Sequence, residues 1–300
     1  MKKVLLFAIL IISLQLQAQK KTDKKTVEIF HSVRTINANT TELVGKGKMD
    51  FQVTHNFDDI AGKRGGIRNF FGLDNSTDVR IGFQVGVGKN MDLLVARAKA
   101  AGNISRLFEL GLKYRFLQQT EDNSTPVSLA LFINNTISSM KASDSPTDDN
   151  YFKNLGDRST QVFELIVARR FGKISLQLNP AFLNQGYVVP NDQKSMFALG
   201  GAIRLPINAK FNIIIDYFHP FRSQSSKDFL FNTKGLKFYD PLGIGLEILT
   251  AGHVFHLNFT NAREILENRF LPRTISNWGK GEFRWGFNIA RKFTLWREKK

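Results

Sequence analysis

His256 and Asn258 are the residues whose types and spacing come closest to catalytic chemistry. They lie two positions apart in the segment VFHLNFT, and this spacing puts both side chains on one face of a β-strand. A histidine oriented by an amide could take the proton of a serine hydroxyl, as in a lipase. No serine lies on the same strand. We therefore interpret the pair as ordinary polar residues of one sheet face and expect no enzymatic activity.

The histidines also fail to form a metal-binding pattern. His253 and His256 have opposite strand parity, so their side chains point to opposite faces, and the other three histidines are scattered. The sequence contains no cysteine, no HExxH motif and no acidic calcium loop. The glycines of Gly82–Gly88 lie within a strand pattern and do not lead into a helix, so they do not predict a phosphate-binding loop. We expect neither a metal nor a cofactor.

The segments that carry these side chains alternate between apolar and polar residues with a period of two. In Phe108–Phe116 and in Phe283–Phe293, aromatic and aliphatic residues alternate with charged residues, glycine or asparagine. This period indicates β-strands with a different environment on each face. One missed or false hairpin would give ten or fourteen strands. We predict twelve strands, at Met49–Phe57, Asp78–Val87, Met91–Ala98, Leu107–Leu117, Val127–Asn135, Thr160–Phe171, Ile174–Leu183, Met196–Leu205, Phe211–His219, Pro241–Thr250, His253–Thr260 and Phe283–Phe293.

The connections between these strands alternate between short and long. Gly172–Lys173 is a tight turn, for example, whereas Thr136–Ser159 is a long loop. Tight turns at one end and long loops at the other are typical of an outer-membrane β-barrel, with both termini and the tight turns on the periplasmic side. Val27–Ile36 also has strand character and is either a further strand or a segment inside the lumen. A solvated helical turn over Ala262–Asn268, capped by Asn261, is expected in the last long loop.

A soluble, secreted β-sandwich would show the same alternation. Two observations favour a membrane barrel instead. The apolar face is rich in phenylalanine, with 27 in the chain, and aromatic residues gather near strand ends, where interfacial girdles lie. The opposite face carries full charges, which a packed sandwich core would exclude. We predict a single all-β domain, an antiparallel up-and-down transmembrane barrel over residues 49–293.

The N-terminus has the pattern of a secretory signal peptide over residues 1–19. Lys2 and Lys3 precede the apolar run Val4–Ile12, which is too short to span a bilayer, and Ala18 is a candidate for the last residue before cleavage. An uncleaved anchor is the alternative. The absence of cysteine excludes a lipid-anchored N-terminus and disulfides. We expect Sec export and residence in the outer membrane of a Gram-negative cell envelope.

The excess positive charge of the chain does not lie on the predicted lumen face. The formal charge of +16 becomes +14 when Lys2 and Lys3 leave with the signal. Much of the excess is in a basic N-terminal extension, residues 20–48, and a basic C-terminal tail, residues 294–300. These tails could contact anionic lipid or a periplasmic or envelope protein partner. No basic stripe interleaved with aromatic residues follows one element, so we expect no nucleic-acid binding.

The polar face of the strands, taken as the lumen, carries equal numbers of basic and acidic residues. The charges either pair across a narrow, partly plugged interior, which we favour because a twelve-stranded barrel is small, or they line a water channel in segregated rings. The acids Glu109 and Glu164 are candidates to pair with Arg115 and Arg170. The candidate lumen-facing residues are Arg80, Glu109, Lys113, Arg115, Glu164, Arg170, Asp216, Glu247, His256, Arg284 and Lys292, with Asp50, Asp78, Asp92 and Arg204 completing the charge balance.

Four segments carry a family resemblance, namely Phe30–Phe57, Phe70–Val87, GHVFHLNFTNA at Gly252–Ala262 and KGEFRWGFNIARKF at Lys280–Phe293. They resemble a family of uncharacterised β-barrel proteins secreted by Bacteroidetes-type bacteria. The resemblance implies a signal peptide followed by one barrel of unknown function, and it brings no catalytic or binding residues.

Two functions therefore remain open. The first is a narrow porin-like or gated passage for small solutes across the outer membrane. The second is a non-conducting barrel with a structural or assembly role, whose basic N-terminal extension and long loops make the contacts.

Overall fold

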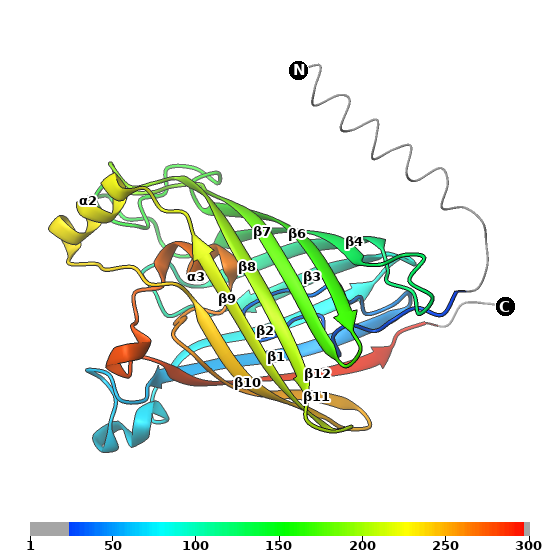
Figure 1. The fold of residues 1–300 in the computed structure, drawn as a ribbon. Coiled ribbons are helices and arrows are strands. Elements are labelled where there is room, and N and C mark those ends of the chain that lie inside the picture. The colour runs from blue at the N-terminus through cyan, green and yellow to red at the C-terminus, as the bar shows by residue number, and fades with distance from the viewer. Residues whose placement is uncertain (1–23, 297–300) are drawn as a thin grey trace.

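The computed structural model describes residues 24–296; the predicted signal peptide over residues 1–19 and residues 297–300 of the predicted C-terminal tail lie outside them. Twelve antiparallel strands form a closed barrel in which sequence neighbours pair and β1 closes on β12 (Figure 1). The predicted number and order of strands are confirmed. The strands are β1 (Lys48–Asp59), β2 (Ser76–Gly86), β3 (Met91–Ala98), β4 (Leu107–Leu117), β5 (Ser128–Ser138), β6 (Ser159–Phe171), β7 (Ile174–Gln185), β8 (Ser195–Pro206), β9 (Phe211–Pro220), β10 (Leu242–Leu249), β11 (His253–Thr260) and β12 (Arg284–Thr294).

The closure of the barrel keeps the two faces of the sheet separate. Asp50 of β1 pairs with Lys292 of β12 and with Gln84 of β2, so three polar residues meet on the inner face. On the outer face, Phe51 packs against Phe83 with ring centroids 5.2 Å apart. Because side chains alternate between faces, this register puts one set of alternate residues of each strand outside, and Phe51 and Phe83 belong to that outer set.

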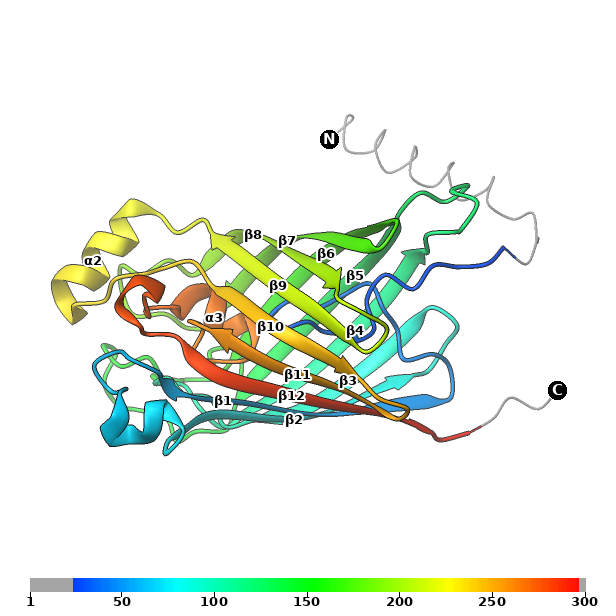
Figure 2. The ribbon, with the colours of Figure 1, turned by 60° about the horizontal axis from the view of Figure 1, so that its bottom comes forward.

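The short and long connections separate to opposite ends, as predicted (Figure 1). We call these the turn end and the loop end; the described N- and C-terminal residues both lie at the turn end (Figure 2). The loop end carries η1 (Ile67–Gly72), α2 (Gln224–Lys234) and η2 (Trp278–Lys280). Ser223 caps α2 at its start, and Gly235, with φ of 64°, ends it. Among residues 24–296, no helix is both long enough and apolar enough to cross a membrane.

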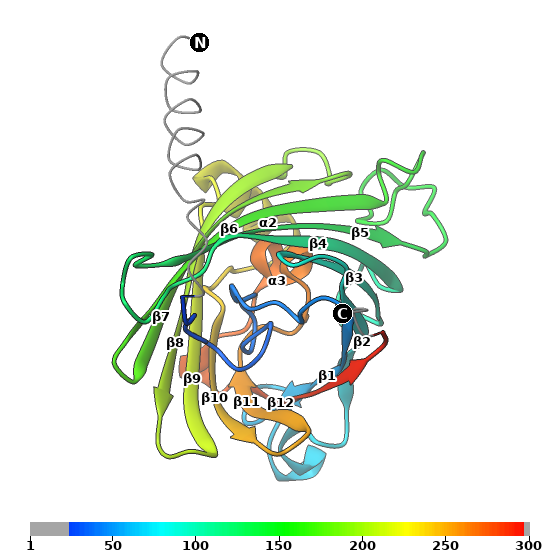
Figure 3. The ribbon, with the colours of Figure 1, turned by 90° about the vertical axis from the view of Figure 1, so that its right-hand side faces the viewer.

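Two segments of the chain fill the interior of the barrel. Residues 27–44 enter from the turn end, and the β11–β12 loop folds inward with α3 (Glu267–Arg273). A view along the barrel shows both inside the ring of strands (Figure 3). We call residues 27–44 and 261–276 together the plug. Val27–Ile36 is thus a lumen segment and not a further strand.

The expected helical turn in the last loop is wrong in position and environment. The helix begins at Glu267, later than predicted, and six of its seven residues are buried in the lumen. Asn261 does not cap it. Its Oδ1 accepts the N–H of Leu242 at 2.8 Å, and its Nδ2 donates to the carbonyls of Asp240 and Ser276. Asn261 therefore fixes the point where the loop turns into the barrel.

Candidate functional site

On the inner face of β6 to β9, apolar side chains form a cluster among the polar ones, and the plug packs against this cluster. Phe218 of β9 contacts Phe270 of α3 with ring centroids 5.3 Å apart. This explains why Phe218 breaks the alternation of its strand, because an inward aromatic residue is stable only where the plug covers it. The buried residues of this cluster are mainly Val162, Leu183, Met196 and Phe218 of the wall and Ile29, Phe30, Phe270 and Leu271 of the plug.

A single wall carboxylate holds the tip of the N-terminal plug segment. Oδ2 of Asp216, on β9, accepts the backbone N–H groups of Ile36, Asn37 and Ala38 at 3.0, 2.7 and 3.1 Å, and the hydroxyl of Thr35 at 2.7 Å. Its Oδ1 accepts Nδ2 of Asn37 at 2.8 Å. Successive backbone N–H groups that converge in this way form an anion-binding concavity. Asp216 therefore replaces the backbone partners that this irregular turn lacks.

Basic and amide side chains of the wall satisfy the carbonyl groups of the same segment. Lys113 Nζ donates to the carbonyl of Val33 at 2.9 Å, and Arg204 Nε donates to the carbonyl of Ile29 at 2.9 Å. Gln177 Nε2 donates to the carbonyl of Asn39 at 2.7 Å. Irregular backbone at membrane depth is stable only when such partners are supplied. The charged inner face thus serves to hold the plug backbone.

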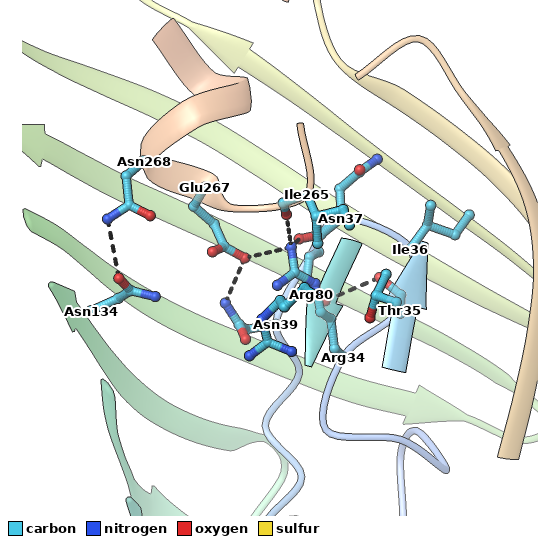
Figure 4. A network of polar contacts seen from close by, with 12 residues as sticks. Arg34, Thr35, Ile36, Asn37, Asn39, Arg80, Asn134, Ile265, Glu267 and Asn268 are labelled. Carbon is cyan, nitrogen blue, oxygen red and sulfur yellow. Dashed lines mark hydrogen bonds and ion pairs between the residues drawn. The ribbon is translucent and has the colours of Figure 1, made fainter. Parts of the chain in front are cut away.

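One buried ion pair joins the two plug segments (Figure 4). Arg34 Nη2 lies 3.1 Å from Glu267 Oε1, and the two side chains are 4% and 1% exposed. Arg34 Nη2 also donates to the carbonyls of Asn37 and Ile265. Asn39 Nδ2 donates to the same Glu267 oxygen at 3.0 Å. The N-terminal segment and the β11–β12 loop therefore form one polar unit at the centre of the lumen.

A second set of ion pairs lies at the loop end. Arg273, at the end of α3, lies 3.2 Å from Asp149 and 3.4 Å from Asp192, and Lys234 lies 3.2 Å from Asp149. Burial alone would raise the pKa of Asp149, but the neighbouring charges, with Arg273 foremost, hold that pKa below its ordinary value. The pairs tie three loops to the plug.

The arrangement is that of a barrel whose lumen is filled by its own chain. A family model described as "Membrane bound beta barrel domain (DUF5777)" matches residues 30–293. The chain belongs to this family. The match begins at Phe30, inside the plug, so the DUF5777 domain includes most of the N-terminal plug segment as well as the strands. This confirms the resemblance to a membrane-bound barrel family, whereas the Bacteroidetes origin stays a prediction.

Solved structures share the DUF5777 barrel fold at very low sequence identity. An outer membrane channel of the COG4313 type from Pseudomonas putida F1 aligns with a TM-score of 0.51 and 13% identity, over 86% of this chain and 100% of that one. The NanC porin aligns with a TM-score of 0.49 and 6% identity, over 82% and 100%, and the KdgM porin with 0.48 and 9%, over 82% and 99%. At such identities the likeness shows the fold alone, a barrel of outer-membrane type. No curated protein matches the chain.

Some residues predicted to face the lumen pair within the wall of the DUF5777 barrel. Arg80 Nε lies 2.7 Å from Glu109 Oε2, and both side chains are buried. His256 lies 3.2 Å from Glu247, its direct cross-strand neighbour. Arg284 pairs at 2.8 Å with Asp59, an acid that the strand pattern did not single out.

Other predicted residues contact the plug, and the expected pairing of Glu109 with Arg115 and of Glu164 with Arg170 is wrong. Glu164 accepts a hydrogen bond from Asn39 of the plug at 3.1 Å. Arg115 lies 3.7 Å from Glu42, and Arg170 donates to the carbonyl of Glu28 at 2.9 Å. Lys113 and Asp216 bind plug backbone as described above. Lys292 is exposed and lines a cavity of about 220 Å³ at the turn end with His31 and Asp50.

The described residues do not assemble the hydrolase site that His256 and Asn258 suggested. The Nε2 atom of His256 bonds to Glu247, and its Nδ1 has no partner among residues 24–296. No hydroxyl is within hydrogen-bond distance of this histidine in the described part of the chain. The same residues hold no cluster of side chains that could bind a metal ion.

Sequence reasoning missed the residues that lock the plug, Arg34, Asn39 and Glu267. Each lies outside the predicted strands, so strand parity said nothing about it. The available signals were a lone arginine in the strand-like segment Val27–Ile36 and an acidic residue beside the apolar pair Phe270 and Leu271 in a loop.

Proposed function

We propose that this protein is an outer-membrane barrel that provides a gated passage for small solutes, closed in its resting state by the plug. The chain reaches the outer membrane of a Gram-negative cell by Sec export after loss of the signal peptide, residues 1–19. Residues 49–293 form the barrel, residues 20–48 supply the N-terminal part of the gate, and residues 294–300 form a basic tail. The outward apolar face contacts membrane lipid.

The observation that carries this proposal is the unequal inner face of the barrel. Over β6 to β9 the plug packs against a cluster of apolar side chains and is also hydrogen-bonded to polar ones, as described above. On β1 and β12, by contrast, the buried inward side chains are almost all polar, among them Gln52, Thr54 and Asn288. Separating the plug from the polar side exposes groups that water can satisfy, while separating it from the apolar side exposes hydrocarbon. The plug would therefore swing away from the polar side and stay anchored on the other, which opens a narrow passage.

The alternative is a non-conducting barrel, and the buried ion pair between Arg34 and Glu267 favours it. A buried pair that resists separation would keep the lumen closed throughout. Because residues 27–44 lie in the lumen, they are not free to act as the partner-binding extension that we expected. A structural role would then rest on the long loops.

A reversible disulfide between plug and wall distinguishes the gated passage from the non-conducting barrel. A Cβ at Gly243 would lie 2.9 Å from Cγ2 of Ile36, so position 243 is next to the plug. The same Cβ would lie 2.7 Å from Oδ1 of Asp216 and 2.9 Å from Nδ2 of Asn37, so these side chains must shift to reach the Cβ separation of a disulfide, about 3.5–4.5 Å. The chain has no cysteine of its own, so Ile36→Cys with Gly243→Cys gives one defined bond. We expect planar-bilayer openings of the reduced protein to disappear on oxidation and to return with reductant.

The single variants Ile36→Cys and Gly243→Cys are the matched controls, the second because a side chain at position 243 presses on Asp216, and both should conduct equally under oxidising and reducing conditions. If wild type, reduced and oxidised proteins are all silent, the non-conducting role replaces the gated passage. Conductance that persists in the oxidised double variant would show that solutes do not pass the plug.

A further inference from the structure

A cavity of about 460 Å³ lies at the loop end, between the β1–β2 loop, the β3–β4 loop and the plug loop. We call it the loop-end cavity. Three basic residues from these three segments line it, Arg64, Lys99 and Arg263. Its size is within the range of small-molecule sites, roughly 300–1,000 Å³.

The carboxylates around this cavity already have partners. Asp58, the acid in its lining, lies 3.0 Å from Arg64. Two further acids lie close to the cavity. Asp59 pairs with Arg284 at 2.8 Å, and Glu264 pairs with Arg269 at 2.8 Å. These carboxylates are therefore committed to cations other than Arg263 and Lys99.

Arg263 and Lys99 are the two basic residues of the cavity lining that have no such acidic partner among the described residues. Within residues 24–296, neither side chain forms a hydrogen bond or an ion pair, and Arg263 Nε is buried without a partner. Burial, and next the neighbouring charge of Arg64, lower the pKa of Arg263, while Asp58, Glu264 and Asp59 act against this. Arg263 is half-buried and Lys99 is exposed. A buried Nε–H without an acceptor is unfavourable, and an anion placed between these two cations would supply the missing partner.

The rest of the lining suits hydroxyl groups. Asn75, Ser76 and Thr77 form one wall of the cavity. The Thr77 hydroxyl is used by backbone carbonyls and that of Ser76 by His55, whereas the Asn75 amide has no side-chain partner in the described part. That amide can both donate to and accept from a ligand hydroxyl.

The loop-end cavity is also connected to the gate. Arg263 lies two residues before Ile265, whose N–H donates to Asp78 at 2.9 Å and whose carbonyl accepts from Arg34 of the plug. A ligand that draws Arg263 toward the cavity would therefore also move Ile265, the acceptor of Arg34, and the segment that leads to Glu267.

We propose that the loop-end cavity binds a small hydroxylated anion, a sugar-sized molecule carrying a phosphate or carboxylate group, with Arg263 and Lys99 on the anionic group and Asn75 on a hydroxyl. This inference rests on the proposed function and deepens it, because it names the class of solute that the passage recognises. Arg64 contributes positive potential while remaining paired with Asp58.

Calorimetry on the mature full-length chain, refolded in detergent, tests the site without any need for conduction. The probes are glucose 6-phosphate, glucuronate, glucose and inorganic phosphate. We expect both sugar anions to bind, glucose to show no binding, and phosphate to bind more weakly than glucose 6-phosphate. Arg263→Gln should weaken the binding of glucose 6-phosphate by tenfold or more, and Lys99→Gln should weaken it by a smaller factor.

Lys173→Gln, at an exposed turn on the opposite end, is the matched control and should bind as wild type does. Failure of wild type to bind either sugar anion, equal binding of glucose, or unchanged affinity in both Arg263→Gln and Lys99→Gln would overturn the proposal. These outcomes are independent of the disulfide experiment. A silent bilayer recording with intact binding contradicts the gate alone, and channel openings without binding contradict the site alone.

Discussion

Arg34 and Glu267 come from opposite ends of the chain and meet in the middle of the lumen, with Nη2 and Oε1 3.1 Å apart. The arginine belongs to the segment that enters at the turn end, and the glutamate belongs to α3, which enters from the loop end. Neither segment would be held as firmly by the wall alone. The ion pair at the centre of the lumen is thus a contact between the two segments of the plug.

Replacement of Arg34 by alanine should loosen the plug. Glu267 would keep only the amide of Asn39 and would remain buried without its counter-ion, which costs about 3–5 kcal/mol. We expect a lower free energy of unfolding in urea and more frequent bilayer openings. The double variant Arg34→Ala, Glu267→Gln removes the uncompensated charge and should recover part of the stability. A double variant less stable than Arg34→Ala would contradict this role of the pair.

The two buried acids Glu109 and Glu164 should respond differently to neutralisation. Glu109→Gln leaves Arg80 buried without its partner at 2.7 Å, so we expect a loss of about 3–5 kcal/mol. Glu164 accepts hydrogen bonds from the amides of Asn39 and Asn179, one on each of its two oxygens, and a glutamine keeps only one oxygen that can accept. Glu164→Gln should therefore lose one of these hydrogen bonds, at about 1–3 kcal/mol, and cost less than Glu109→Gln. Equal losses, measured by urea unfolding in the same detergent, would show that Glu164 also balances a cation.

The strands could be predicted closely from sequence because their signal is local. Met91–Ala98 and His253–Thr260 agree with the structure at both ends, since alternation and the flanking turns are both read within a few residues. Phe218 falls on the polar parity of its strand, and its contact with Phe270 of the plug explains this departure from the pattern.

The plug itself could not be derived in the same way. Val27–Ile36 alternates like a strand, but its neighbours are side chains of the wall, such as Asp216, and these contacts are set by distant parts of the chain. Parity identifies the inner face of a strand and says nothing about what occupies the lumen. The partners of Glu164 and Arg115 were therefore misjudged, although both were named as lumen-facing residues.

The cost of placing an arginine on the outer face should depend on how deep in the membrane the residue lies. Leu112 lies at the middle of β4, whereas Phe116 lies near its turn end and is 38% exposed. Leu112→Arg should cost about 2–4 kcal/mol on insertion and Phe116→Arg about 0–1 kcal/mol. The comparison is made by the folded fraction in heat-modifiable gels after refolding into bilayers. Similar losses in both variants would place the apolar belt elsewhere.

Acid should release the loops that ion pairs hold at the loop end. The pKa of Asp149 is held below its ordinary value of 3.8, so its contribution to stability is fully present above that value and is lost as the pH falls through its lower folded pKa. We expect the 139–158 loop to resist pepsin at about pH 4 and to be cleaved as the pH falls further below the ordinary aspartate pKa. Asp149→Asn should be cleaved equally across this range. Cleavage of wild type that does not change with pH would contradict the assignment.

The most direct measurement is the chemical accessibility of a single cysteine in the plug. Thr41 is fully buried, and its hydroxyl has no hydrogen-bond partner among the described residues, so Thr41→Cys removes no hydrogen bond. Lys173→Cys, on an exposed turn, is the reference. With a membrane-impermeant maleimide, we predict rapid labelling at Lys173→Cys, almost none at Thr41→Cys, and faster labelling of Thr41→Cys when Arg34→Ala is added. Labelling of Thr41→Cys as fast as Lys173→Cys in the otherwise wild-type chain would show a lumen open to water and would contradict a barrel closed by its own N-terminal segment.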